Sequence, residues 1–278
     1  MIWKRKQFWG TVVAVLLLAY CLKDVRLHDI KHLSARLDYV YFAPATGAAL
    51  LFIVSRVLRW RLILSPQKYL GIPRAIGLYS TGQILNVVMP ALTGQVGRMF
   101  LFASKEGLKK TLIFSTIVLE ILFDGVSLVF VVILASLAFA IPDDYRFLAI
   151  IISSLTVALL VVLYLILHYQ QALEESGRRW LRGRWPGAYV VIRKFIRSFA
   201  RGIDLLRSSQ HLAGSLAYSI FSWLMHISVI FFLLKSFGVA LPFATAAFIM
   251  LINTLALMVP LTPANAGTFE VAVSSTLR

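Results

Sequence analysis

Long apolar runs separated by short basic stretches make up most of this chain. The main runs cover residues 12–22, 40–54, 111–140 and 148–167. A helix needs about 20 mostly apolar residues to cross the hydrocarbon core of a bilayer, and several of these runs reach or approach that length. The pattern predicts an all-α integral membrane protein with about six to seven transmembrane helices.

Basic residues between the runs predict how the helices are oriented. The expected spans are residues 8–22, 39–58, 111–140, 148–169, 212–234 and 243–259. Lys4, Arg5 and Lys6 precede the first span, and cytoplasmic loops carry an excess of Lys and Arg. We therefore expect a single multi-pass domain over residues 1–278 in the inner membrane, with a cytoplasmic N-terminus. The acidic loop at Pro142, Asp143 and Asp144 is expected outside.

The most basic stretch lies between the expected spans 148–169 and 212–234. Residues 170–211 contain nine Lys or Arg residues and only three acidic ones. We expect this stretch to form one or two amphipathic helices on the cytoplasmic face, where basic residues attract anionic lipid headgroups.

The pattern of residues 72–104 does not predict an ordinary transmembrane helix. Residues 72–90 are long enough to cross but contain many polar residues and glycines, whereas residues 91–104 are too short. Basic residues flank the segment on both sides, so we expect a re-entrant pair that enters and leaves on the cytoplasmic side. Irregular backbone at this depth is tolerated only where it is buried in protein or lines a wet cavity.

A second broken segment near the C-terminus repeats this pattern. Gly97 follows Pro90 by seven residues, and Gly267 follows Pro260 by seven. Broken segments in two halves of a chain indicate a transporter's binding site at the membrane midplane, and their expected opposite orientation implies an inverted repeat. The alternative is two ordinary helix breaks. Because the chain stops at Arg278, before another span is complete, we expect its C-terminal end to be truncated or shortened.

The strong positive charge of the chain does not indicate a nucleic-acid-binding protein. The net charge is +16, which in a soluble protein would indicate nucleic acid as a partner. Here 14% of residues are charged, against about 25% in soluble domains, and the charges cluster between apolar runs. The positive-inside rule explains them better than nucleic acid does.

Two acidic residues lie inside an expected span. Glu120 and Asp124 are four residues apart and so share one helical face. Carboxylates in hydrocarbon cost about 2.5–3.5 kcal/mol each and usually serve a function. The expected partners are Arg98 and the pair Arg56 and Arg59. The alternative is a structural ion pair that fixes the helix register.

Three further residues have two interpretations each. Arg98 could hold a lipid phosphate or anchor the chain at the cytoplasmic face. Glu270 could balance a cationic headgroup or cap a helix terminus. His226, alone in the middle of a span, is expected to hydrogen-bond to a neighbouring helix rather than to act in function.

Several motifs resemble the flippase-like membrane domain of bacterial lysylphosphatidylglycerol synthases. They are Arg59-Trp60-Arg61, Asn86-x-x-x-Pro90-x-x-x-Gly94-x-x-x-Arg98 and, from Pro260 to Glu270, Pro-x-x-Pro-x-x-x-Gly-x-Phe-Glu. Two departures are Ala264 after Pro263, where the family commonly has glycine, and the short chain after Glu270. The resemblance implies a lipid-handling domain, which in those synthases moves aminoacylated lipid that a separate soluble domain makes. Nothing in this chain could be that soluble domain.

The function expected is therefore a flippase-like lipid transporter, not an enzyme. Its lipid would have a polar headgroup, of the aminoacyl-phospholipid, hopanoid or glycolipid type. The alternative is an accessory subunit that docks a separate lipid-modifying enzyme through residues 170–211, and a membrane transferase is less favoured. No metal-ligand spacing, phosphate-binding loop or nucleophile elbow is present, so we expect no cofactor and no metal. The candidate substrate-binding residues are Asn86, Pro90, Gly94, Gly97, Arg98, Glu120, Asp124, Pro260, Pro263, Asn265, Gly267 and Glu270.

Overall fold

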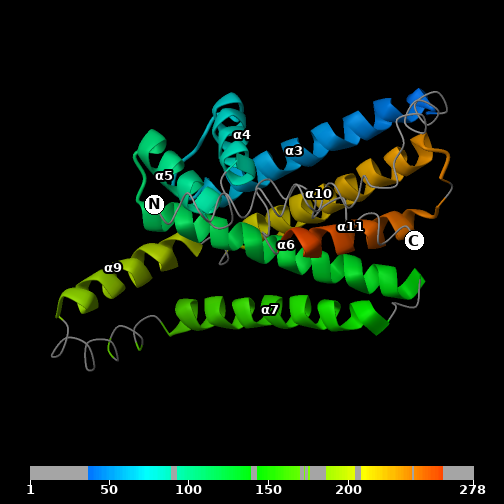
Figure 1. Cartoon of the computed structure of the whole chain (residues 1–278). Helices are drawn as coiled ribbons and strands as arrows, with labels where there is room; N and C mark the ends of the chain where they lie inside the picture. The colour runs from blue at the N-terminus through cyan, green and yellow to red at the C-terminus, as the bar shows by residue number, and fades with distance from the viewer. Residues whose placement is uncertain are drawn as a thin grey trace, which may run out of the picture.

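The computed structural model describes residues 37–88, 93–138, 143–169, 172, 175, 186–203, 208–239 and 241–258. All regular structure in these residues is helical, which confirms the all-α prediction (Figure 1). The elements are η1 (Tyr39–Tyr41), α3 (Phe42–Leu64), α4 (Ile72–Val88), α5 (Thr93–Glu106), α6 (Lys110–Ala138), α7 (Asp143–His168), α9 (Pro186–Ile203), α10 (Ser209–Ser236) and α11 (Phe243–Met258).

Three of the described segments are long and apolar enough to cross a membrane. They are Tyr39–Leu64, Lys110–Leu134 and Ser209–Ser236. The helices α7 and α11 contain shorter apolar stretches, Ser153–Val162 and Phe243–Thr254. These five helices correspond to five of the expected spans, while the expected span 8–22 lies outside the described residues. The protein is thus an α-helical membrane protein.

Three helix boundaries differ from those expected. The helix α3 continues to Leu64 instead of ending near residue 58, so Arg59 and Arg61 lie within the helix and not at its cytoplasmic exit. Asp143 and Asp144 lie in the first turn of α7 and not in a loop. The helix α10 begins at Ser209, so the basic stretch that precedes it ends earlier than residue 211.

Two helices end at glycines that adopt the left-handed conformation. Gly107, with φ of 65°, follows α5, and Gly238, with φ of 73°, follows α10. Glycine adopts this conformation without the steric cost of a side chain and commonly terminates helices. After α10, the N–H of Val239 donates to the carbonyl of Leu234 at 3.0 Å, which satisfies one of the last carbonyls of the helix.

The long helices form the centre of the molecule. The helices α3 and α10 pack side by side, and α6 contacts both of them together with α7 and α11 (Figure 1). One buried cluster joins Leu128 of α6, Trp223 and Ile227 of α10, and Met250 of α11. Because the membrane core provides no hydrophobic driving force between helices, this contact is held by close packing.

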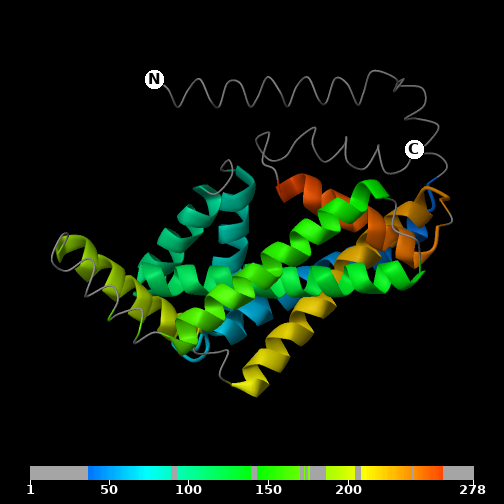
Figure 2. The ribbon, with the colours of Figure 1, turned by 90° about the horizontal axis from the view of Figure 1, so that it is seen from below.

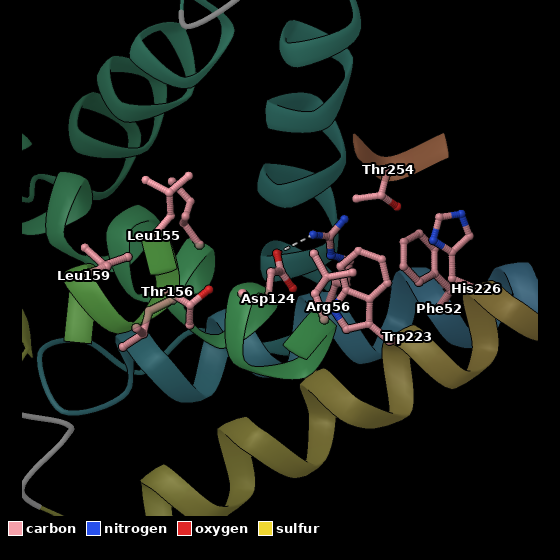
Figure 3. A pocket seen from close by; sticks show the side chains of 13 residues that line it. Phe52, Arg56, Asp124, Leu155, Thr156, Leu159, Trp223, His226 and Thr254 are labelled. Carbon is pink, nitrogen blue, oxygen red and sulfur yellow. Dashed lines mark hydrogen bonds and ion pairs between the residues drawn. The ribbon is translucent and has the colours of Figure 1, made fainter. Parts of the chain in front are cut away.

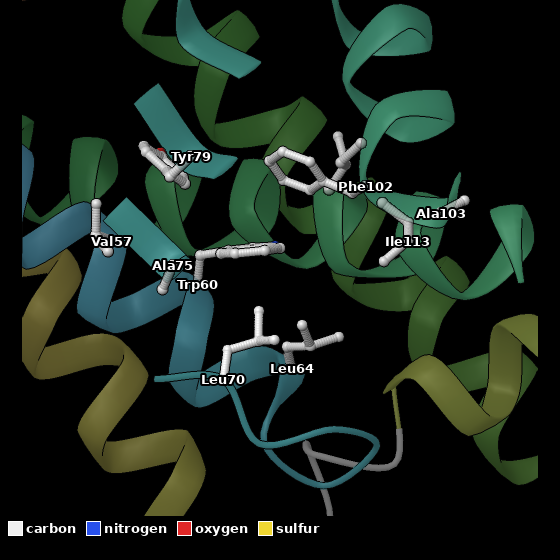
Figure 4. Packing of buried hydrophobic residues seen from close by; sticks show 10 residues of the cluster. Val57, Trp60, Leu64, Leu70, Ala75, Tyr79, Phe102, Ala103 and Ile113 are labelled. Carbon is white, nitrogen blue, oxygen red and sulfur yellow. The ribbon is translucent and has the colours of Figure 1, made fainter. Parts of the chain in front are cut away.

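The helices α4 and α5 form a hairpin at one end of α6 (Figure 2). Trp60 of α3 fills the space between them and is fully buried. Its ring centroid lies 4.5 Å from that of Phe102 and 6.1 Å from that of Tyr79 (Figure 4). A helix of 17 residues, such as α4, is about 26 Å long, which is less than the hydrocarbon thickness of about 30 Å. The hairpin therefore has the dimensions of a re-entrant pair.

Ion pairs join the two open ends of this hairpin. Glu106, the last residue of α5, accepts a hydrogen bond from Nε of Arg74 at 2.7 Å and pairs with Nζ of Lys68 at 2.9 Å. Burial opposes ionisation of Glu106, but the two basic partners outweigh it and hold the pKa of this carboxyl below its usual range. Both ends of the hairpin thus lie on one side, as the re-entrant prediction requires. Its depth in a bilayer stays a prediction.

The helix α9 is the one amphipathic helix described in the basic stretch 170–211. Tyr189 and Phe199 are buried, and Phe199 packs against Phe114 of α6 with ring centroids 6.2 Å apart. Val191 and Phe195 are exposed beside basic residues, although the ring of Phe195 also lies 6.0 Å from that of Phe114. A helix with exposed apolar and basic side chains is typical of a membrane surface.

Candidate functional site

Both acidic residues of α6 pair with arginines, as the sequence predicts. Glu120 receives two hydrogen bonds from Arg98, at 2.9 Å from Nη1 and 2.6 Å from Nη2. Asp124, one turn further along α6, receives hydrogen bonds from Arg56 at 2.7 Å and from Arg59 at 2.6 Å and 3.2 Å. The guanidinium fork matches the two oxygens of a carboxylate, so these pairs fix both partners in place.

The pair of Arg98 and Glu120 is closed off from its surroundings. Arg98 is 1% exposed and Glu120 is 4% exposed. The guanidinium carbon of Arg98 lies 4.7 Å from the ring centroid of Tyr79 and 5.1 Å from that of Phe102. Aromatic faces and a carboxylate therefore surround Arg98. This geometry favours the structural interpretation, in which Arg98 fixes the α4–α5 hairpin on α6, over a direct phosphate contact.

The second pair has two arginines for one carboxylate. Arg59 is fully buried and also donates to Oγ of Ser219 in α10 at 2.7 Å. Arg56, in contrast, keeps 26% of its side chain exposed and Asp124 keeps 19%. Arg59 thus joins Asp124 of α6 to Ser219 of α10, while Arg56 presents part of its surface to the space beside them.

That space is a cavity of about 560 Å³ between α3, α6, α7, α10 and α11 (Figure 3). Its volume lies in the range of about 300–1,000 Å³ that ligand pockets occupy. The lining is mainly apolar, and its polar side chains are Arg56, Asp124, Thr156, His226 and Thr254. A mostly apolar cavity with a few polar groups is the arrangement that binds an amphiphile.

The cavity is divided into a polar end and an apolar end. Arg56, Asp124, Trp223 and His226 lie together at one end, whereas Leu155 and Leu159 of α7 lie at the other (Figure 3). Gly125 lets α7 approach α6 closely at Thr156. A Cβ built on Gly125 would lie 2.7 Å from Oγ1 of Thr156, so a side chain there would force Thr156 to rotate or α7 to shift.

The model of one protein family, the lysylphosphatidylglycerol synthase TM region, matches residues 7–278. The chain belongs to this family. No curated protein and no solved structure matches it. The family resemblance predicted from the three motifs is thereby confirmed, and with it the general assignment of the chain to membrane proteins related to lipid handling.

In this member of the lysylphosphatidylglycerol synthase TM-region family, the structure brings together only some of the predicted site residues. Asp124 lines the cavity, while Arg98 and Glu120 lie beside it in their own closed pair. Asn86 lies in the last turn of α4, and Gly94 and Gly97 lie at the start of α5. Six predicted residues lie outside the described residues: Pro90, Pro260, Pro263, Asn265, Gly267 and Glu270.

Three side chains at the polar end were not among the predicted site residues. Arg56 was expected only as a partner of the acidic pair, Trp223 was not considered, and His226 was expected to hydrogen-bond to a neighbouring helix. Instead, Nδ1 of His226 has no hydrogen-bond partner in the part of the chain that the structure describes, and its ring stacks on Phe52 with centroids 4.9 Å apart. The available signal in the sequence was, for His226, a polar residue in the middle of a span and, for Arg56, an arginine just inside the end of one.

Proposed function

We propose that this protein is a flippase-like lipid transporter of the inner membrane and that it is not an enzyme. Its substrate would be a lipid with a polar headgroup. The observation that carries this proposal is the cavity beside Asp124, Arg56 and Arg59. It combines an apolar end with a charged end among membrane-spanning helices. A charged headgroup costs too much free energy in hydrocarbon alone, and such a cavity would lower that cost during the crossing.

An accessory role is the second candidate, and the surface of α9 is what favours it. The helix exposes Val191 and Phe195 next to Arg193 and Lys194, so it could bind either the anionic leaflet or a lipid-modifying enzyme. We favour the leaflet, because each basic residue near an anionic surface contributes about 1 kcal/mol of attraction.

Lipid movement in proteoliposomes tests the transport proposal. The purified protein, reconstituted with headgroup-labelled lipid, should transfer label between leaflets faster than empty liposomes do. Leu159→Trp should lower this rate about tenfold, the effect of a barrier raised by about 1.4 kcal/mol, because the larger indole would fill part of the cavity through which the lipid passes. Leu159 lines the cavity, whereas the neighbouring Leu160 does not and is 43% exposed. Leu160→Trp is therefore the matched control and should leave the rate unchanged.

The rate of label transfer in this assay distinguishes the transporter from the accessory role. Wild-type protein that moves label no faster than empty liposomes would rule out the transporter and leave the accessory role. Equal rates for wild type and a folded Leu159→Trp would show that the cavity is not the route.

Cysteine labelling tests the proposed orientation. Val40 is 75% exposed in η1, just before the end of α3 that is expected outside, and Val191 is 67% exposed on α9. In a Cys21→Ser background, Val40→Cys should react with an impermeant maleimide in intact cells, and Val191→Cys only after permeabilisation, because loops rich in Lys and Arg stay in the cytoplasm. The reverse pattern would invert the topology.

The same cysteine at position 191 reports on the leaflet contact. An environment-sensitive dye there should shift its emission to the blue in vesicles that contain phosphatidylglycerol, and high salt should weaken the shift by screening. The same emission in neutral and anionic vesicles would exclude the leaflet as the partner of α9.

A further inference from the structure

Three side-chain nitrogens around the cavity have no hydrogen-bond partner in the described residues. They are Nε of Arg56, Nε1 of Trp223 and Nδ1 of His226, and all three residues line the cavity. Most buried polar groups in native proteins are paired, so each unpaired group needs an explanation. All three atoms are themselves buried, so a ligand that brings hydrogen-bond acceptors would pair with them after small rotations of these side chains toward the cavity.

The three side chains belong to one connected group. The ring centroid of His226 lies 4.9 Å from that of Phe52 and 5.9 Å from that of Trp223. The guanidinium carbon of Arg56 lies 5.2 Å from the centroid of the same Phe52 ring. Phe52 thus contacts both Arg56 and His226 at the polar end of the cavity (Figure 3), so the oxygens of one headgroup would have to be several bonds apart to meet all three side chains.

The charges beside the cavity do not balance. Arg56 and Arg59 share Asp124, and Arg98 is neutralised by Glu120. Among the described residues this cluster has three guanidinium groups and two carboxylates, which leaves one excess positive charge. Arg56 is the arginine that lines the cavity, whereas Arg59 is fully buried. An uncompensated charge at membrane depth is costly, and an anionic ligand beside Arg56 would remove that cost.

We infer that the cavity selects a lipid with an anionic phosphodiester headgroup over one with a cationic headgroup. The phosphate lies beside Arg56, and the oxygens of the headgroup as a whole accept hydrogen bonds from Nε of Arg56, from Nε1 of Trp223 and from Nδ1 of His226 in the tautomer that carries its proton there. The first part of the acyl chains lies against Leu155 and Leu159. The inference rests on the proposed function, because it takes the ligand to be a membrane lipid.

An aminoacylated lipid fits this end of the cavity poorly. Its amine would place a second cation beside Arg56, and like charges repel strongly in a medium of low dielectric constant. The acidic residue that could accept the amine, Asp124, already binds two arginines. The charge pattern of this chain therefore favours the unmodified anionic lipid.

Equilibrium binding tests the inference without any transport measurement. The purified full chain in neutral detergent is titrated with dihexanoyl phosphatidylglycerol, dihexanoyl phosphatidylcholine and the lysyl ester of the first lipid. Phosphatidylglycerol should bind about tenfold more tightly than either of the others. Equal or tighter binding of the lysyl ester would overturn the inference. Inorganic phosphate should not compete at equal concentration, and if it does, the site holds a free anion and not a lipid.

Two variants locate the binding in the cavity. Trp223→Phe removes the N–H and keeps the aromatic ring, so the affinity for phosphatidylglycerol should fall about tenfold. Arg56→Gln should abolish the preference over phosphatidylcholine. Trp60→Phe is the matched control, because Nε1 of Trp60 is also buried and unpaired in the described part of the chain but does not line the cavity. It should leave the affinity unchanged.

The outcomes distinguish this inference from the proposed function. Unchanged phosphatidylglycerol binding in a folded Trp223→Phe would overturn the inference, even if the protein moves lipid. Selective binding that depends on Trp223 would support it, even if the protein moves no lipid and only the transport proposal fails. An affinity loss of the same size in Trp60→Phe would show that the effect does not come from the cavity.

Discussion

Glu120→Gln is expected to lower the free energy of unfolding by about 3–5 kcal/mol. This is the cost of removing one partner of a buried ion pair while the other stays charged and buried. The guanidinium of Arg98 would lose its carboxylate while it stays 1% exposed between Tyr79 and Phe102. Neither water nor another described carboxylate reaches it there. Unfolding of the purified protein by heat or by SDS titration in mixed micelles measures the loss.

Glu106→Gln is the matched control for this change. It makes the same substitution in a second ion-paired glutamate, but Lys68 and Arg74 keep 38% and 62% of their side chains exposed. These cations can return to water, and exposed pairs contribute only about 0–1 kcal/mol. Equal losses in both variants would mean that burial does not set the strength of the Arg98 pair.

Gly82→Ala is expected to destabilise the protein by about 1–3 kcal/mol, the usual cost of overpacking a filled site. A Cβ built on Gly82 would lie 2.9 Å from Cγ of Arg98 and 3.1 Å from the nearest ring carbon of Phe102. Arg98 cannot move away without breaking its two hydrogen bonds to Glu120. The helix α4 would therefore have to shift away from α5. The midpoint of thermal unfolding reports the change.

Gly77→Ala in the same helix is expected to have the opposite sign. No atom lies within 4 Å of a Cβ built there, and alanine favours a helix over glycine by about 0.8–1.0 kcal/mol. The two glycines differ only in what surrounds them. If both substitutions stabilise the protein, the close contact between Gly82 and Arg98 does not exist in solution.

The positions of the spans could be predicted because apolar runs have a length set by the bilayer itself. Five expected spans became helices, with ends shifted by a few residues at most places. Arg59 was the main exception, since the sequence placed it at a cytoplasmic exit and the structure buries it fully. Its charge is tolerated at that depth because Asp124, its predicted partner, neutralises it. The sequence did not predict how deeply Arg59 is buried, because its burial depends on helices far apart along the chain.

The candidate site was predicted in part. The spacing of Glu120 and Asp124 predicted that both face inward, and both contact arginines. The sequence did not separate their roles, because both are carboxylates on the same face of one helix. Only packing distinguishes them: aromatic rings enclose the partner of Glu120, while a cavity opens beside the partner of Asp124.

By itself, the sequence determined the class of the protein, its helical spans and its family. It also determined that Glu120 and Asp124 need arginine partners. Each of these follows from the composition, the helical spacing or a motif within a short stretch of the chain. The tertiary structure decided which arginine remains available to a ligand and where the cavity lies. Its lining comes from α3, α6, α7, α10 and α11, so no short stretch contains it. The physical reason is that a cavity and an unpaired donor are properties of what surrounds a side chain, and in this chain those surroundings come from helices far apart in sequence.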